Sequence, residues 1–332
     1  MFIVENYLLA VVLCIITMLC WGSWANTQKL ASQKWNFQLY YWDYSIGVLL
    51  IALIMAFTLG SFGEQGRPFI EDLSQADSSA LLSAFIGGVV FNGANLLLVI
   101  AIEITGMAVA FPVGIGLALV IGVMDNYLKE PSADSTLIFT GVILIVFAII
   151  LNAIAYKRLP NQSSGSFKGL IIALIAGVAM GFFYGFVAES MSMNFVTPKI
   201  GKLTPYTALV AFSFGIFISN FGFNTVNMYK PIAGEQTSYH QYFKLGTPQL
   251  HFIGILGGVI WGIGMGLNIL ASEVASPAVS YGLGQGATMV AAFWGVVIWK
   301  EFKTAPSSTS KLLNFMFLLF IIGLGLIVYS KI

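Results

Sequence analysis

Charged side chains are scarce in this sequence. Asp, Glu, Lys and Arg make up 9% of its 332 residues, whereas 58% are hydrophobic and the mean hydropathy is +0.88. Soluble domains carry about 25% charged residues, so this composition excludes a soluble fold and indicates a polytopic membrane protein. The formal net charge of +1 also lacks the basic excess that favours nucleic acid as a partner.

Cysteine and histidine are also nearly absent. Cys14 and Cys20 fall in the first apolar run at a spacing that fits no metal or redox motif, so we expect both to pack there. His240 and His251 lie in or beside one polar loop and do not make a metal site. The sequence has no phosphate-binding Gly-rich loop, nucleophile motif or convergent acid–base pair. We therefore expect no cofactor, no metal and no enzymatic activity.

Long apolar runs account for most of the chain. Runs of about 20 apolar residues are typical of membrane-spanning helices. The ten predicted spans are 7–28, 39–61, 80–102, 105–127, 135–156, 167–190, 204–228, 250–272, 275–299 and 310–330. The longer polar connections at 62–79, 157–166 and 229–249 could not hold a soluble domain. The sequence thus predicts an all-α polytopic membrane protein embedded in a lipid bilayer.

The positive charges predict how the chain is oriented. The first apolar run follows Glu5 and no basic residue, so it is expected to be a retained helix and not a cleaved signal peptide. Ten of the 15 Lys and Arg residues flank the connections after the first, fifth, seventh and ninth spans. Lys and Arg collect on the cytoplasmic side. Both termini are therefore expected on the outer side of a plasma or bacterial inner membrane. We also expect the protein to be a monomer or a homodimer.

The second half of the sequence repeats the first. FIGGVVF at 85–91 matches ILGGVIW at 255–261, and the same offset of 170 places Glu103 on Glu273. Each half, 1–158 and 165–332, holds five predicted spans. Because five is odd, the second half must cross the membrane upside down. Two inverted five-helix repeats are typical of alternating-access transporters, and a duplicated scaffold without a transport role is the alternative.

A carboxylate inside a span costs about 2.5–3.5 kcal/mol at the bilayer centre and indicates function. Glu189 follows Gly177, Gly181 and Gly185 at spacings of four, where small residues let a neighbouring helix approach. Its counterpart in the repeat is Asn26. We expect Glu189 to bind substrate and to couple transport to a proton. The alternative is a solvated side chain at the end of the sixth span.

Three further carboxylates are candidates for proton coupling or gating. Asp43 lies in the first two turns of the second span, where it either favours the helix dipole or takes part in coupling. Glu103 and Glu273 end the third helix of each half, at tight corners on opposite sides of the membrane. This placement favours a structural or gating role at the water interface over direct coupling.

Amide and aromatic side chains share faces of several predicted helices. Aromatic rings can stack on a flat or ring-shaped solute while amides offer donors and acceptors. The alternative roles are interfacial tryptophans and hydrogen bonds between helices. The proline and glycines of FPVGIG and YGLGQG weaken the fourth and ninth helices at matching places. Backbone groups freed in this way are tolerated in a membrane only against protein or a cavity, so both helices are predicted to line the substrate path. The predicted substrate-binding residues are Trp21, Trp24, Asn26, Gln28, Asn92, Asn95, Tyr184, Glu189, Trp261, Asn268 and Gln285.

The segments DYSIGVLL at 43–50, PYTALVAFSF at 205–214 and FWGVVIWKE at 293–301 resemble the ureide permeases of plants over nearly the whole chain. LCWGS at 19–23 and GGVIWGIGMG at 257–266 resemble the glucose/ribose porters. Both branches belong to the drug/metabolite transporter (DMT, EamA-like) superfamily, whose five-plus-five architecture the chain is similar to. The long central loop of the plant proteins is missing here, so no role of that loop carries over.

The resemblance implies a proton-coupled secondary importer of a small, neutral, polar metabolite. The WGIG block and the tryptophan content favour a monosaccharide such as ribose or glucose. A ureide or nucleobase such as allantoin or uracil is the close alternative. Export of drugs or amino acids, as elsewhere in the superfamily, is a further alternative. Export fits less well. An exporter of cationic drugs needs a central carboxylate facing an apolar cavity, whereas the candidate helix faces of this sequence combine amides with aromatic side chains.

Overall fold

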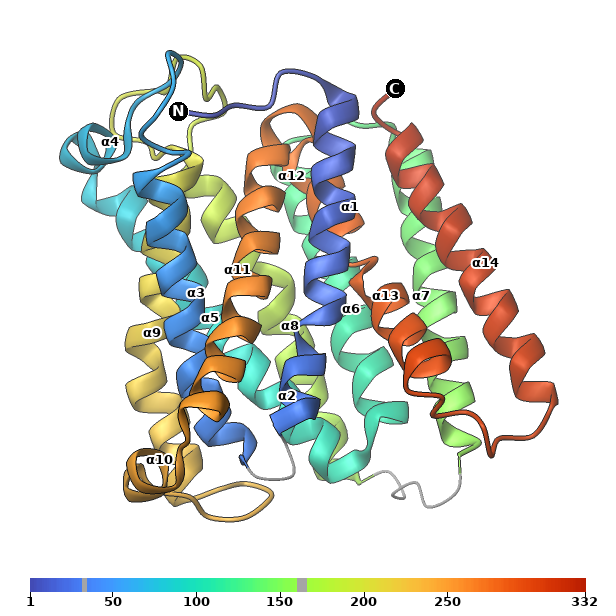
Figure 1. The fold of residues 1–332 in the computed structure, drawn as a ribbon. Coiled ribbons are helices and arrows are strands. Elements are labelled where there is room, and N and C mark those ends of the chain that lie inside the picture. The colour runs from blue at the N-terminus through green and yellow to red at the C-terminus, as the bar shows by residue number, and fades with distance from the viewer. Residues whose placement is uncertain (32–34, 160–165) are drawn as a thin grey trace.

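The computed structural model describes residues 1–31, 35–159 and 166–332, which form a bundle of helices (Figure 1). Ten spans in these residues are long and apolar enough to cross a membrane, which confirms the predicted number. Eight are single helices: α3 (Phe37–Phe57), α5 (Ser78–Thr105), α6 (Met107–Lys129), α7 (Ser135–Lys157), α8 (Phe167–Ser190), α9 (Pro205–Tyr229), α11 (Pro248–Ala275) and α14 (Ser308–Tyr329).

The first and ninth spans are composite. The first joins α1 (Tyr7–Ser23) to α2 (Ala25–Ala31) through a turn at Trp24. The ninth consists of α12 (Pro277–Gly284), α13 (Ala287–Phe293) and the π-helix η1 (Trp294–Ile298). Two short helices lie in connections that the sequence indicated only as polar: α4 (Phe69–Gln75) and α10 (Tyr239–Leu245).

Local sequence determines where several helices begin. The Asp134 carboxylate accepts a hydrogen bond from the Leu137 backbone N–H at 2.9 Å and caps α7. Thr247 caps α11, and Pro248, which has no N–H to leave unsatisfied, occupies its first turn. Ser238 and Gln241 form a reciprocal capping box that starts α10.

Both termini lie at one end of the bundle, together with α4, and α10 lies at the opposite end (Figure 1). We call these the terminal end and the α10 end. The described ends of the first, fifth, seventh and ninth spans, which the positive-inside rule predicts to be cytoplasmic, lie at the α10 end.

Helix packing is compatible with the predicted inverted repeat. In the repeat, α1 corresponds to α8, α3 to α9 and α5 to α11. The contact between α5 and α8 therefore has its counterpart between α11 and α1, and the contact between α3 and α11 has its counterpart between α9 and α5. All four pairs are in extensive contact. The pair α7–α14 maps onto itself and lies at one edge of the bundle (Figure 1).

The two tight corners share an unusual backbone conformation. Gly106, before α6, has φ 79° and ψ 158°, and Ser276, before α12, has φ 76° and ψ 153°. These residues are related by the same offset of 170 that relates Glu103 to Glu273. Positive φ at a serine is strained. Because it recurs at the equivalent position, the corner geometry is a property of both halves.

The terminal end is closed by buried polar contacts between the halves. Asp72 in α4 is fully buried and accepts hydrogen bonds from the backbone N–H and the hydroxyl of Thr204, at 2.8 and 3.0 Å. Arg67 lies 3.5 Å from the Asp72 carboxylate and donates to the Pro198 carbonyl at 2.8 Å. These contacts fasten the connection before α5 to the segment that starts α9.

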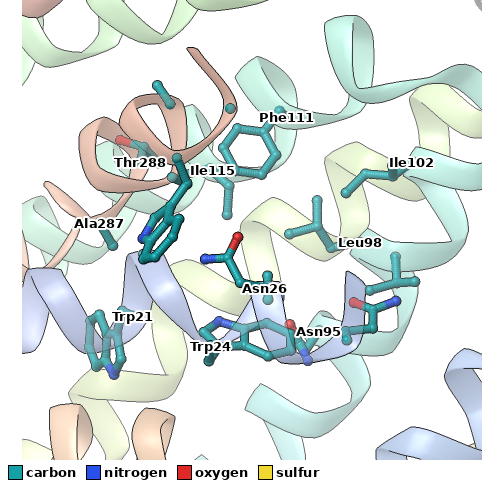
Figure 2. Close-up of a pocket in the computed structure, with 18 of the residues that line it drawn as sticks. Trp21, Trp24, Asn26, Asn95, Leu98, Ile102, Phe111, Ile115, Ala287 and Thr288 are labelled. Atoms are coloured by element: carbon teal, nitrogen blue, oxygen red, sulfur yellow. The ribbon is translucent and has the colours of Figure 1, made fainter. Parts of the chain in front are cut away.

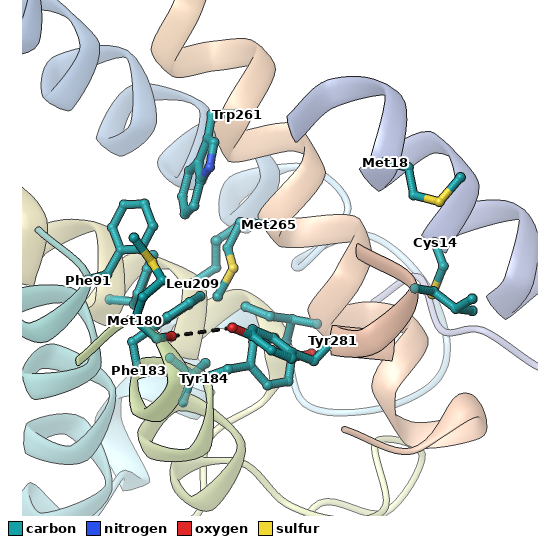
Figure 3. Close-up of a cluster of buried hydrophobic side chains, with 14 of the residues drawn as sticks. Cys14, Met18, Phe91, Met180, Phe183, Tyr184, Leu209, Trp261, Met265 and Tyr281 are labelled. Atoms are coloured by element: carbon teal, nitrogen blue, oxygen red, sulfur yellow. Dashed lines mark hydrogen bonds between the residues drawn. The ribbon is translucent and has the colours of Figure 1, made fainter. Parts of the chain in front are cut away.

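A cluster of buried aromatic and sulfur-containing side chains fills the middle of the bundle (Figure 3). Phe91 packs against Trp261 and Phe183, with ring centroids 4.5 and 5.1 Å apart. Tyr281 donates a hydrogen bond to the Met180 carbonyl at 3.3 Å, which ties α12 to α8.

Candidate substrate-binding site

A cavity of about 500 Å³ lies between the aromatic cluster and the α10 end. Cavities that bind small molecules are about 300–1,000 Å³. Side chains of α1, α2, α5, α6 and α13 surround the Asn26 amide (Figure 2). Seven of the predicted substrate-binding residues line this cavity: Trp21, Trp24, Asn26, Gln28, Asn95, Trp261 and Gln285.

Aromatic rings form the deep end of the cavity. We define the aromatic floor as the rings of Trp21, Phe91, Phe183 and Trp261 with the Met180 side chain among them, all of which line the cavity and belong to the core or pack against it. The two tryptophans stack with centroids 5.7 Å apart and planes 12° apart. The floor therefore separates the cavity from the terminal end and offers flat apolar surface to a bound ring.

Amide groups line the walls above this floor. Asn26 accepts a hydrogen bond from the Trp299 indole at 2.6 Å and donates to the Ser23 carbonyl at 2.9 Å. Asn95 donates to the Tyr41 hydroxyl at 3.1 Å. Asn152 also lines the cavity, and its Oδ1 atom is buried without a hydrogen-bond partner among the described residues.

The ninth span breaks beside the cavity. Gln285 and Gly286 form a turn between α12 and α13, in which the Gly286 N–H donates to the Leu283 carbonyl at 2.9 Å. Both Gln285 and Thr288 line the cavity. The sequence predicted weakened helices at both matching sites. In the first half, however, α6 continues through Pro112 without a break, so only the second half has an interrupted helix here.

An ion pair lies at the mouth of the cavity, near the α10 end. Lys29 of α2 is 2.6 Å from one carboxylate oxygen of Glu301, and the Tyr156 hydroxyl of α7 donates to the other at 2.9 Å. The Lys29 ammonium also lies 4.3 Å from the centre of the Trp299 ring, a cation–π distance. Among the described residues, Lys29 and Glu301 are the only charged side chains that line the cavity.

Four predicted substrate-binding residues lie outside the cavity. Asn92 donates to the Ile216 carbonyl and the Ser219 hydroxyl, at 3.2 and 2.8 Å. Asn268 donates to the Ser280 carbonyl at 2.7 Å, and buried Tyr184 is 3.1 Å from the Ser280 hydroxyl. These three side chains make hydrogen bonds between helices, the alternative role that the sequence allowed. The fourth, Glu189, is exposed at the end of α8.

Asp43 lies outside the cavity in a closed network at the α10 end. It is 1% exposed and holds His251 Nδ1 at 2.9 Å, the Tyr242 hydroxyl at 2.6 Å and the Trp35 indole at 3.3 Å. Burial, and then the hydrogen bond to Asp43 and its charge, raise the pKa of Tyr242. The network joins α3, α10 and α11.

Glu103 and Glu273 lie at the two corners, as their places in the sequence indicate. One oxygen of Glu273 accepts a hydrogen bond from the Phe195 backbone N–H at 2.7 Å, and the other is buried without a partner among the described residues. Glu103 is exposed near the connection after α9. Neither carboxylate lines the cavity.

Sequence reasoning missed several cavity residues, notably Asn152, Tyr156, Thr288, Trp294 and Glu301. With one insertion, Lys300-Glu301 corresponds to Lys129-Glu130 of the first half, but a repeat match does not indicate which residues meet at a site. Within the part of the chain that the structure describes, no group of three or more His, Cys, Asp or Glu side chains could hold a metal ion.

The described residues form a helical bundle of ten apolar spans around a cavity lined by aromatic rings and amide groups, which is the form of a membrane transporter. The family model for ureide permeases matches residues 40–164 and 157–330. The chain belongs to the ureide permease family.

Relatives cover the whole chain. Ureide permease 2 of Arabidopsis thaliana is 26% identical over 100% of this chain and 99% of its own length. Ureide permease 1 of the same plant is 24% identical over the same shares. Probable ureide permease A3 of Vigna unguiculata is 23% identical over 87% of this chain and 94% of its own.

A protein of known crystal structure aligns with a TM-score of 0.60, covering 96% of this chain and 95% of its own, at 12% identity. This likeness supports the fold alone. The comparisons do not support the expected monosaccharide preference. They favour the ureide alternative, and they agree with an integral membrane protein of a permease family.

Proposed function

We propose that this protein is a secondary transporter that imports a ureide or nucleobase, such as allantoin or uracil, by alternating access. The observation that carries the proposal is the cavity, in which tryptophan faces and amide groups meet in a space of about 500 Å³. Membership of the ureide permease family supports the same substrate class.

The chemistry of the cavity suits such compounds. Ureides and nucleobases are small, flat over their N–C=O groups, and alternate N–H donors with carbonyl acceptors. Trp21 and Trp261 offer stacking surface, and the amides of Asn26, Asn95 and Asn152 offer both donors and acceptors. A bound N–H group would also satisfy the buried Asn152 oxygen, which otherwise costs free energy.

The transport cycle follows from the two halves, 1–158 and 165–332. The excess of Lys and Arg at the α10 end supports a cytoplasmic location for that end and external termini, in a plasma or bacterial inner membrane. The described state then faces inward. Rocking of one half against the other would open the aromatic floor and the Asp72 network at the terminal end while the cavity mouth closes. An inward proton gradient drives accumulation.

Purified protein in liposomes tests the proposal. With an inward proton gradient, labelled allantoin or uracil should accumulate, and labelled ribose and glucose should not. A protonophore should reduce accumulation to equilibration if a proton is coupled. Uptake of the sugars alone, or outward flux of cationic drugs without ureide uptake, contradicts the proposed substrate class. Empty liposomes and a lipid-matched unrelated protein are the controls.

A further inference from the structure

We propose that Lys29, Tyr156 and Glu301 form a subsite that binds the N–H and C=O groups of a ureido or cyclic imide substrate; this rests on the proposed function. In the subsite, the Glu301 carboxylate accepts the substrate N–H groups and the Lys29 ammonium donates to the substrate carbonyl. Tyr156 is a positioning residue that orients the carboxylate.

The three side chains come from separate elements and converge at the cavity mouth. Lys29 lies on α2, Tyr156 on α7, and Glu301 follows η1. The distances from Glu301 are 2.6 Å to the Lys29 ammonium and 2.9 Å to the Tyr156 hydroxyl. The carboxylate is thus held by one donor on each oxygen.

The Glu301 carboxylate keeps the capacity to bind a ligand. A carboxylate has about four lone-pair sites, so one contact to each Glu301 oxygen, from Lys29 and from Tyr156, leaves sites for a substrate N–H. The side chains of Lys29 and Glu301 are 43% and 29% exposed, and both belong to the cavity lining.

Hydrogen-bond geometry explains why such a pair selects ureido compounds. The edge of a ureido or cyclic imide group places an N–H directly beside a C=O. The N–H can therefore donate to the Glu301 carboxylate while the adjacent carbonyl accepts from the Lys29 ammonium, which lies 2.6 Å from that carboxylate. A sugar hydroxyl rotates freely and presents no such fixed pair, so it gains less from a carboxylate.

The surroundings of the subsite extend toward the amide groups of the cavity. Asn152 precedes Tyr156 by four residues on α7, so both side chains lie on one helix face. Trp299 contacts the Lys29 ammonium with its ring and Asn26 with its indole N–H. A substrate held at Glu301 is thereby placed beside the amides that line the rest of the cavity.

A purely structural ion pair is the competing role, in which Lys29 and Glu301 only fasten α2 to the end of the ninth span. Half-exposed ion pairs contribute little to stability. The chain offers a matched control: Lys129 and Asp125 form an ion pair at 2.9 Å whose side chains do not line the cavity.

The charge-swapped double variant Lys29→Glu, Glu301→Lys separates the two roles, because it retains an ion pair but places its charges the wrong way round for the substrate. We expect Glu301→Gln to lower allantoin or uracil uptake at least tenfold and the swap not to restore it. Asp125→Asn should transport within twofold of the parent protein. Restoration by the swap to within twofold of the parent overturns the subsite.

A second measurement does not depend on how well the variants fold. Uracil and 1,3-dimethyluracil, which lacks both N–H groups, compete for uptake of labelled substrate. The parent protein should prefer uracil at least tenfold, and Tyr156→Phe should lose part of that preference without losing all uptake. Equal competition by both compounds in the parent protein overturns the subsite. Failure of the parent protein to take up any ureide or nucleobase refutes the proposed function itself.

Discussion

Trp21 and Trp261 stack across the floor of the cavity with planes 12° apart, and the Trp21 indole donates to the Trp261 carbonyl at 3.2 Å. The first residue belongs to the first half of the chain and the second to the other half. In the proposed transport cycle the halves move against each other, so this contact would slide or separate. Under that proposal the tryptophan pair is both a substrate surface and part of the closed gate.

Replacing Trp261 with Ala should damage both stability and transport. Trp261 is 5% exposed and contacts Trp21, Phe91 and Phe212. Loss of a buried tryptophan side chain costs about 3–5 kcal/mol. We expect Trp261→Ala to lower the free energy of unfolding in detergent by about that amount and to reduce uptake more than Trp261→Phe does. The exposed Phe315 gives the control Phe315→Ala, and equal effects of both alanine variants would contradict this role.

Replacing Asn152 with Ala should lower transport without lowering stability. Its Oδ1 atom is buried and unpaired among the described residues, so removing it relieves a desolvation cost instead of breaking a hydrogen bond. We expect a loss of about 1.4 kcal/mol of substrate binding, a tenfold rise in Kd, with the melting temperature unchanged or raised. Asn126 is the control, because its Oδ1 is also buried and unpaired but the residue lies outside the cavity. A similar binding loss in Asn126→Ala would contradict a direct role for Asn152.

The sequence predicted the ten spans and much of the cavity, for identifiable physical reasons. Span length and apolar composition are local properties, and the shared faces of the first, third and eighth spans follow from helical periodicity. Periodicity does not reveal which neighbour a face meets. Asn92 and Asn268 therefore carried the same signal as Asn26, yet they bond to α9 and α12.

The proposed subsite at the cavity mouth could not be derived from sequence alone. Tyr156 and Glu301 meet across 145 positions of the chain and Lys29 and Glu301 across 272. All three residues lie at the ends of helices, where a charge or a tyrosine is also typical of the membrane–water interface. Only the packing of α7 against α14 and of α1 against α13 brings these ends together.

Replacing Glu189 with Gln tests the sequence-based assignment of proton coupling. Glu189 is exposed at the end of α8, and its backbone carbonyl accepts a hydrogen bond from Lys202. Because the carboxylate lies outside the cavity, we expect Glu189→Gln to accumulate substrate to within about twofold of the parent level. A twofold change corresponds to a free-energy difference of about 0.4 kcal/mol. Loss of accumulation with intact substrate binding would restore Glu189 to the coupling role. Uptake with and without a protonophore is the measurement.

Replacing Tyr242 with Phe should change how stability depends on pH. The pKa of Tyr242 is raised above its ordinary value of about 10 by burial, by its hydrogen bond to Asp43 and by that charge. A pKa raised by folding contributes stability that is fully present below the unfolded pKa and is lost as pH rises toward the folded one. The parent should therefore be more stable than Tyr242→Phe at pH 8, and the difference should shrink above about pH 10.

Denaturant unfolding in detergent at pH 8 and pH 11 measures this difference. At pH 8 the variant should lose about 1.5–3 kcal/mol, the contribution of a hydrogen bond to a charged group. Tyr329 is 63% exposed on α14, so Tyr329→Phe should match the parent at both pH values. A Tyr242→Phe difference that stays constant between pH 8 and pH 11 would show that Tyr242 stabilises α10 by packing and not through its proton shared with Asp43.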